Sequence, residues 1–95
     1  MAVNIMLWKT IDEIDLEVAQ RLRRIRKRQK ISQEALAAKS GVSLGSIKRF
    51  EQTGEISLKS LTKLASALNC TADIEALFTQ VPYDSLEGVL NESRL

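Results

Sequence analysis

The chain of 95 residues contains no histidine and only one cysteine, one proline and four aromatic residues. The absence of histidine excludes the classical zinc sites, the serine–histidine–aspartate triad and a histidine general base. The single cysteine, Cys70, cannot form an internal disulfide, which fits the reducing environment of the cytoplasm. We therefore expect a cytoplasmic protein without a bound metal or cofactor.

Long apolar runs and catalytic motifs are also missing. No apolar run approaches the roughly 20 residues that a membrane span requires. The N-terminal sequence MAVNIMLWKT lacks the basic flank and the cleavage site of a secretory signal. The chain has no acid pair at a motif spacing and no glycine-rich phosphate loop ending in Gly-Lys-Ser or Gly-Lys-Thr. The sequence thus predicts a protein that is not an enzyme, has no catalytic residues and does not bind a membrane.

The formal net charge is only +2, but the charge is unevenly distributed. Residues 1–20 carry one basic and four acidic side chains, whereas residues 21–30 carry seven basic side chains and no acid. Residues 31–50 add a net charge of +2, and residues 51–95 are acidic. Phosphate binding requires clustered lysine and arginine rather than a high total charge. The clustering over residues 21–50 therefore indicates a nucleic-acid partner.

The scarcity of glycine, proline and aromatic residues favours an all-α protein. Apolar residues recur at positions 11, 14, 18, 22 and 25, which is helical spacing. Thr10 and Glu13 form a capping box at the start of this predicted helix, which spans residues 11–29. Its buried stripe is expected to contain Ile14, Val18, Leu22 and Ile25.

Four further helices are predicted from their caps. Ser32, Ser43 and Ser57 precede helices over 33–40, 44–52 and 58–68, and Gly41 ends the first of these. Thr71 begins a fifth helix that reaches about residue 78 and is expected to pack through Ile74, Leu77 and Phe78. The chain then divides into an N-terminal segment (1–10), a helical domain (11–80) and a C-terminal tail (81–95) that holds at most one weak helical turn.

Residues 32–51, SQEALAAKSGVSLGSIKRFE, are the most informative segment. They consist of two short predicted helices joined by a tight glycine turn, with apolar residues at 36, 37, 42, 47 and 50. This segment resembles the helix-turn-helix of the Cro/C1/Xre family of bacterial and phage DNA-binding regulators, and the resemblance extends over about residues 18–79. It implies a compact five-helix bundle of the lambda-repressor-like type. It also implies that the second helix of the motif lies in the major groove of double-stranded DNA.

The resemblance assigns DNA contacts to individual positions. Gln33 would bind a phosphate at a helix N-terminus, and the Thr53–Ser57 loop would supply a second backbone contact. Arg49 is the best candidate for a base contact, because its planar fork can donate to O6 and N7 of guanine together. The candidate DNA-binding residues are Gln33, Ser43, Leu44, Gly45, Ser46, Lys48, Arg49, Arg28, Lys30, Thr53, Ser57 and Lys59. Arg26 and Glu51 match positions that form a structural ion pair in many relatives.

Three aspects of function stay open at this point. A single motif spans few base pairs, so we expect a homodimer on a palindromic operator with half-sites about 34 Å apart. The alternating residues Val3, Ile5 and Leu7 could pair as strands in that dimer. The stretch SGVSLGSIKRFEQTGEISLKSLTKLASAL is similar to HipB-type antitoxins, which implies a HipA-type kinase partner and repression of the protein's own operon. The alternative is a protein-interaction module with little DNA binding of its own, which the apolar pair Leu44–Gly45 slightly favours.

Overall fold

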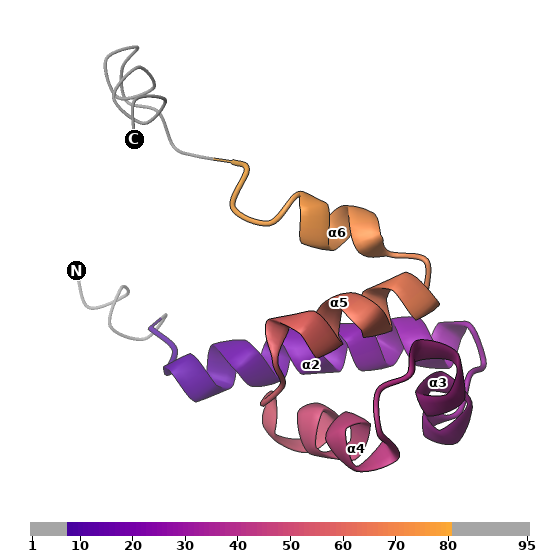
Figure 1. Ribbon diagram of the computed structural model, residues 1–95. Helices are drawn as coiled ribbons and strands as arrows, with labels where there is room; N and C mark the ends of the chain where they lie inside the picture. Colours follow the sequence, from indigo (N-terminus) through magenta and orange to yellow (C-terminus); the bar gives the residue numbers. More distant parts are fainter. Residues whose placement is uncertain (1–7, 81–95) are drawn as a thin grey trace.

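The computed structural model describes residues 8–80. Within this range the chain forms five helices and no strand: α2 (Ile11–Arg28), α3 (Gln33–Ser40), α4 (Leu44–Thr53), α5 (Leu58–Ala67) and α6 (Thr71–Glu75) (Figure 1). The predicted all-α, five-helix architecture is confirmed. The predicted pairing of Val3, Ile5 and Leu7 and the predicted turn in the C-terminal tail lie outside the described residues.

Side-chain caps start the first four helices at the predicted positions. At α2, the Glu13 amide donates to Thr10 Oγ1 at 3.0 Å, and the Thr10 amide donates to Glu13 Oε1 at 3.2 Å. The hydroxyls of Ser32, Ser43 and Ser57 each accept a hydrogen bond from the amide three residues later, at 3.0–3.1 Å. Each cap is worth about 1 kcal/mol, so short helices begin where the sequence predicts.

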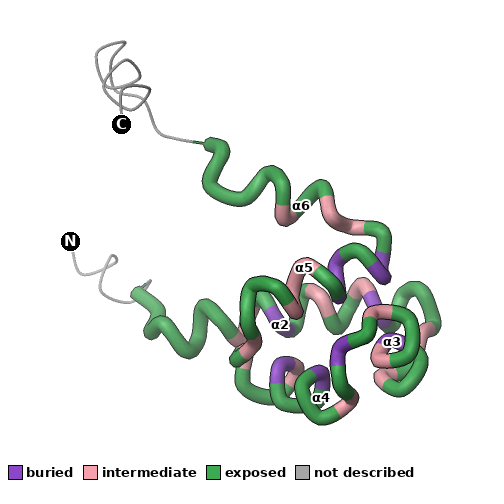
Figure 2. The backbone as a smooth tube through the Cα atoms, in the orientation of Figure 1, coloured by how far each residue is buried: buried purple, intermediate pink, exposed green. Residues whose placement is uncertain are grey.

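The core lies where α4 meets α2 and where α3 meets α4 and α5. Its fully buried side chains come from four helices and the residue that caps α5: Ala19, Leu36, Ile47, Phe50, Leu64 and Leu68. Figure 2 shows these buried positions gathered toward the middle of the bundle. Burial of each large aliphatic or aromatic side chain contributes about 1.5–3 kcal/mol. The core therefore holds α4 by its inner face.

The prediction of the buried stripe on α2 is wrong in its N-terminal half. Ile14 is 48% exposed and Val18 is 37% exposed, and only Leu22 and Ile25 pack against the core. The residue of α2 that is fully buried is Ala19, on the side that packs against α4. The stripe fails because no described element closes over the face of the helix that carries Ile14 and Val18.

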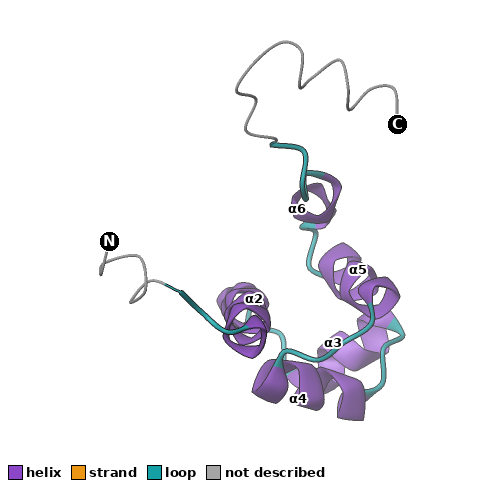
Figure 3. Ribbon diagram, turned by 90° about the vertical axis from the view of Figure 1, so that its left-hand side faces the viewer, coloured by secondary structure: helices purple, strands orange, loops and turns teal. Residues whose placement is uncertain are grey.

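The fifth predicted helix is shorter than expected, since α6 ends at Glu75. Leu77 and Phe78, which were expected to pack, are 48% and 87% exposed. α6 packs against α5 and stands away from α2 (Figure 3). The result is an apolar groove of about 790 Å³ between α2, α5 and α6. We call this groove, which Ile14, Val18, Leu58, Leu61, Leu77 and Phe78 line, the α2–α6 groove.

None of the helices between residues 8 and 80 combines the length and the apolar character needed to cross a membrane.

Candidate nucleic-acid interface

A largely buried ion pair connects α2 to the end of α4. Arg26 Nε donates to Glu51 Oε2 at 2.8 Å, and Arg26 Nη2 donates to Glu51 Oε1 at 2.9 Å. The two side chains are only 9% and 6% exposed. Arg26 Nη1 also donates to the carbonyl oxygen of Ile31 at 2.8 Å. The pair expected from the family resemblance is therefore present, and Arg26 serves the fold rather than the surface charge.

Two further residues complete this network. Gln33 Nε2 donates to Glu51 Oε1 at 3.0 Å, and Arg23 Nε lies 3.7 Å from the same oxygen. Burial alone would raise the pKa of Glu51, but the hydrogen bonds from Arg26 and Gln33 and the Arg26 charge lower that pKa overall. Glu51 is therefore a carboxylate at neutral pH, and it joins α2, α3 and α4. No sequence pattern predicted the contact between the Gln33 side chain and Glu51.

The turn between α3 and α4 has the expected geometry. Gly41 caps α3 in the left-handed conformation, with φ at +77°, and its amide donates to the Ala37 carbonyl oxygen. The next amide, that of Val42, donates to Ser40 Oγ at 3.1 Å. The Val42 side chain is 5% exposed and belongs to the core. A short turn anchored by one buried valine thus sets α4 across α3.

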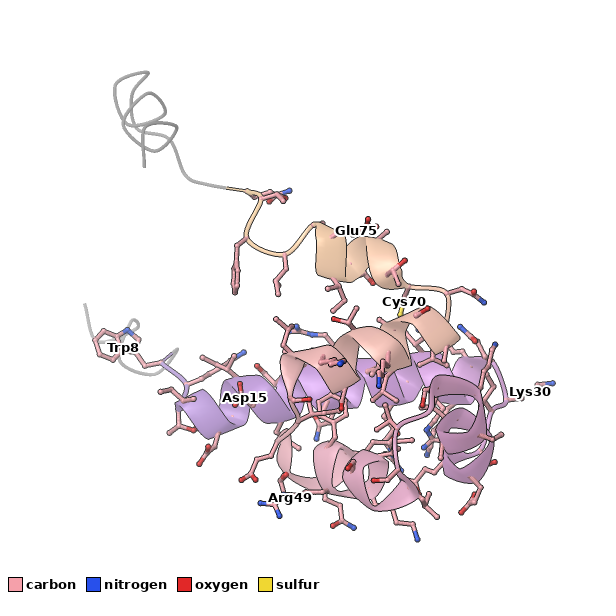
Figure 4. The ribbon with its side chains drawn as sticks, viewed as in Figure 1. Trp8, Asp15, Lys30, Arg49, Cys70 and Glu75 are labelled. Carbon is pink, nitrogen blue, oxygen red and sulfur yellow. The ribbon has the colours of Figure 1, made fainter. Side chains whose placement is uncertain are left out.

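The two sides of α4 differ sharply in exposure. Ile47 and Phe50 are at most 1% exposed, whereas Gly45, Ser46, Lys48 and Arg49 lie on the exposed side. Leu44 is half-buried. Arg49 extends away from the bundle at its outer edge, whereas Lys30 lies at its other end (Figure 4). The predicted groove-facing residues of α4 therefore share one surface, except that Leu44 is only partly accessible.

The flanking candidates fall into two groups. Arg28, Lys30, Lys48 and Lys59 are exposed cations, and Lys30 adopts a left-handed backbone conformation with φ at +58°. The hydroxyls of Ser43 and Ser57 are already engaged as helix caps, and Ser43 Oγ also donates to Ser46 Oγ at 2.8 Å. The Ser43 O–H is therefore occupied, whereas the Ser57 hydroxyl only accepts in its cap and keeps its O–H as a donor for phosphate.

Sequence reasoning missed one contact on this surface. Arg49, the candidate for base recognition, forms an ion pair with Glu55, and both its Nε and its Nη2 donate to Glu55 Oε2. The pair lies beside a shallow cleft of about 350 Å³ between α4 and the start of α5. A spacing of six residues across a helix end is not a recognised sequence signal for pairing. The contact depends on how the chain turns at Gly54, whose φ is +83°.

These features define a helix-turn-helix protein: two short helices, a left-handed glycine turn, and a second helix whose outer face is polar and exposed. The helix-turn-helix family model of the Cro/C1 type matches residues 22–74, in agreement with this geometry. The match covers more than half of the chain, and the chain belongs to this family of DNA-binding regulators. No curated protein matches the chain. No solved structure matches it either.

Proposed function

We propose that this protein is a sequence-specific regulator that binds double-stranded DNA with α4 in the major groove. The observation that carries the proposal is the division of α4 into a buried face, formed by Ile47 and Phe50, and an exposed face that carries Lys48 and Arg49. A helix held by its core side can enter the groove without unfolding any part of the bundle. No catalytic residue, metal or cofactor is required.

The proposed contacts divide into those that position the protein and those that specify sequence. Arg49 donates to guanine, and Ser46 lies on the same exposed face. Lys48, Arg28, Lys30 and Lys59 contact phosphates. Gln33 uses one amide hydrogen on Glu51 and retains a second, as well as its backbone amide at the start of α3, for a phosphate.

The test is selection of bound sites from random duplex DNA, followed by titration of the best site at two salt concentrations. We expect a consensus sequence and a steep loss of affinity with salt. Arg49→Ala should abolish the preference at one base pair, a loss of about 1–3 kcal/mol. The matched variant Lys48→Ala should weaken binding to all sequences equally and lower the salt slope by about one. Binding without a consensus would contradict the proposal.

We also propose that the protein acts as a homodimer on a palindromic operator. The support is twofold: one motif covers few base pairs, and the α2–α6 groove leaves large apolar side chains exposed on the described residues. Contiguous apolar patches of this kind mark interaction sites, and a second copy of the chain is the occupant we infer. Sedimentation equilibrium on the full chain should give a dimer mass, and Val18→Glu should shift it toward the monomer. A monomeric wild-type chain would contradict this.

The similarity of residues 40–68 to HipB-type antitoxins supports a narrower proposal. The protein would repress its own operon in the cytoplasm and bind a HipA-type kinase through a surface away from α4. Co-expression of this protein with a kinase encoded beside it, followed by co-purification, tests this proposal directly. If the kinase binds and Arg49→Ala leaves that binding unchanged, the two surfaces are separate.

The second candidate function is a protein-interaction module on the same fold. Two observations favour it: Leu44 is half-buried and Gly45 offers no side chain, so the first turn of α4 has little with which to contact bases. The site selection described above decides between the two candidates. A chain that binds no duplex at moderate salt but captures a protein partner would support the interaction module.

A further inference from the structure

The Arg49–Glu55 pair is the feature of the exposed α4 surface that the proposed function does not use. Arg49 Nε donates to Glu55 Oε2 at 3.0 Å, and Arg49 Nη2 donates to the same oxygen. The side chains are 68% and 62% exposed. An isolated ion pair at this exposure contributes little to the free energy of unfolding. Stability alone therefore does not account for this contact.

A second connection ties the same two residues together through Thr53. Thr53 Oγ1 donates to the Arg49 carbonyl oxygen at 2.7 Å and accepts a hydrogen bond from the Glu55 amide at 3.1 Å. The Glu55 backbone is thereby attached to the last turn of α4, while its carboxylate returns to the Arg49 guanidinium. These contacts form a closed ring from the backbone of Arg49 to its own side chain. The ring restricts the direction of the guanidinium, which a single surface pair would not do.

The hydrogen bonds to Glu55 also determine which donors of Arg49 remain. A guanidinium has five N–H groups, and two of its edges present parallel pairs: Nε with Nη2 at the side, and Nη1 with Nη2 at the end. Glu55 Oε2 accepts from both nitrogens of the side edge. Bidentate recognition of guanine O6 and N7 needs one complete edge. The end edge is therefore the one available to a base.

We propose that Glu55 is a positioning residue that orients Arg49 so that its end edge faces a guanine, and that Glu55 thereby determines sequence specificity. This inference rests on the proposed DNA-binding function. The same carboxylate repels phosphates and lowers affinity for every duplex. Because specificity is a difference between affinities, Glu55 increases the ratio of specific to non-specific binding while it weakens binding overall.

The test compares Glu55→Gln with Glu34→Gln in the full chain. Glu34 is an exposed acid in the first turn of α3, so its substitution removes the same charge without touching Arg49. Each protein is titrated with the selected duplex, with that duplex lacking the recognised guanine, and with a random duplex. We expect Glu55→Gln to lower the preference for guanine about threefold to tenfold, a part of what one bidentate contact provides. Its affinity for random duplex should rise about twofold to fivefold at low salt.

Glu34→Gln should raise affinity for all three duplexes and leave the preference for guanine unchanged. A second readout needs no DNA: the ¹⁵N relaxation of Arg49 Nε should report an ordered N–H in the wild-type chain and a mobile one in Glu55→Gln. Thr53→Val should lower the preference for guanine in the same direction, because it opens the ring.

The outcomes separate this inference from the proposed function. If the wild-type chain has a preference that Arg49→Ala removes but Glu55→Gln retains, DNA recognition stands and the positioning role is wrong. An Arg49 Nε signal that is equally mobile in both proteins would also overturn it. A wild-type chain with no sequence preference would overturn both proposals. A uniform gain of affinity in Glu55→Gln with unchanged preference would mean that Glu55 only repels DNA.

Discussion

The two ends of α2 belong to differently packed halves of the molecule. In its C-terminal half, Leu22 and Ile25 pack against a core whose side chains, such as Leu36 and Ile47, are at most 1% exposed. Arg26 in the same half forms the buried ion pair with Glu51 of α4. The N-terminal half of α2 borders the α2–α6 groove, where Ile14 and Leu77 are each 48% exposed. The helix-turn-helix half is thus self-sufficient within residues 8–80, whereas the groove half presents apolar surface that the described residues do not cover.

Replacement of one phenylalanine in each half should give the largest contrast. Phe50→Ala leaves a cavity in the core and should lower the free energy of unfolding by about 3–5 kcal/mol. Phe78→Ala, at a side chain that is 87% exposed, should change it by less than about 0.5 kcal/mol. Urea denaturation at low protein concentration measures both. A large loss in Phe78→Ala at a concentration too low for dimers would break the comparison, because it would mean that the groove half is covered within the single chain.

The buried ion pair should give the next largest effect. Glu51→Gln leaves the Arg26 charge without a partner and should cost about 3 kcal/mol at neutral pH, as removing one member of a buried pair does. Glu55→Gln breaks an exposed pair of the same chemical type and should cost at most about 1 kcal/mol. Equal losses in the two variants would show that burial does not set the strength of these pairs.

The comparison of Glu51→Gln with the wild-type chain should also show a pH dependence of the free energy of unfolding. The pKa of Glu51 is below its ordinary value of 4.5 in the folded chain, because its hydrogen bonds with Arg26 and Gln33 outweigh the effect of burial. Its stabilising contribution is therefore complete above pH 4.5 and is lost as the pH falls further, through the folded-state pKa. The gap in stability between wild type and Glu51→Gln should narrow below pH 4.5. Urea titrations from about pH 7 down to about pH 3 would show whether it does.

Gly54 ends α4 and packs closely against the backbone of α2, so we expect it to tolerate no side chain. A Cβ at this position would lie 2.6 Å from the carbonyl carbon of Asp15 and 2.7 Å from the amide nitrogen of Leu16, and φ is +83°. We expect Gly54→Ala to cost about 2 kcal/mol or more, from the left-handed backbone and the clash together. Gly41→Ala has a similar φ of +77° but open space, so it should cost only about 1 kcal/mol. Thermal unfolding of the two variants isolates the clash.

The sequence predicted what depends on local chemistry. Thr10, Ser32, Ser43 and Ser57 cap helices as expected, because a hydroxyl three residues before an amide needs no distant partner. The inward placement of Ile47 and Phe50 follows from helical spacing in the same way. The Arg26–Glu51 pair was expected only through the family resemblance, since nothing local joins residues 25 positions apart.

The predictions that were wrong depended on tertiary contacts, which the local sequence does not reveal. Helical spacing on α2 identified an apolar stripe but not which neighbour would cover it, so Ile14 and Val18 were assigned to the core. The extent of α6 depends on packing against α5 as well as on its own sequence. The Arg49–Glu55 contact depends on the left-handed turn at Gly54, which brings a loop acid back over the helix.

The last prediction concerns Gly45, and it separates folding from recognition. A Cβ at Gly45 meets nothing within 4 Å, and the residue lies in the first turn of α4 without a positive φ. Gly45→Ala should therefore stabilise the fold, by up to about 1 kcal/mol from helix propensity. If Gly45 lets the α4 backbone approach DNA closely, the same methyl group should weaken binding to the selected duplex. A variant that is more stable and binds equally well would place Gly45 outside the DNA contact, and it would shift base recognition further toward Ser46 and Arg49.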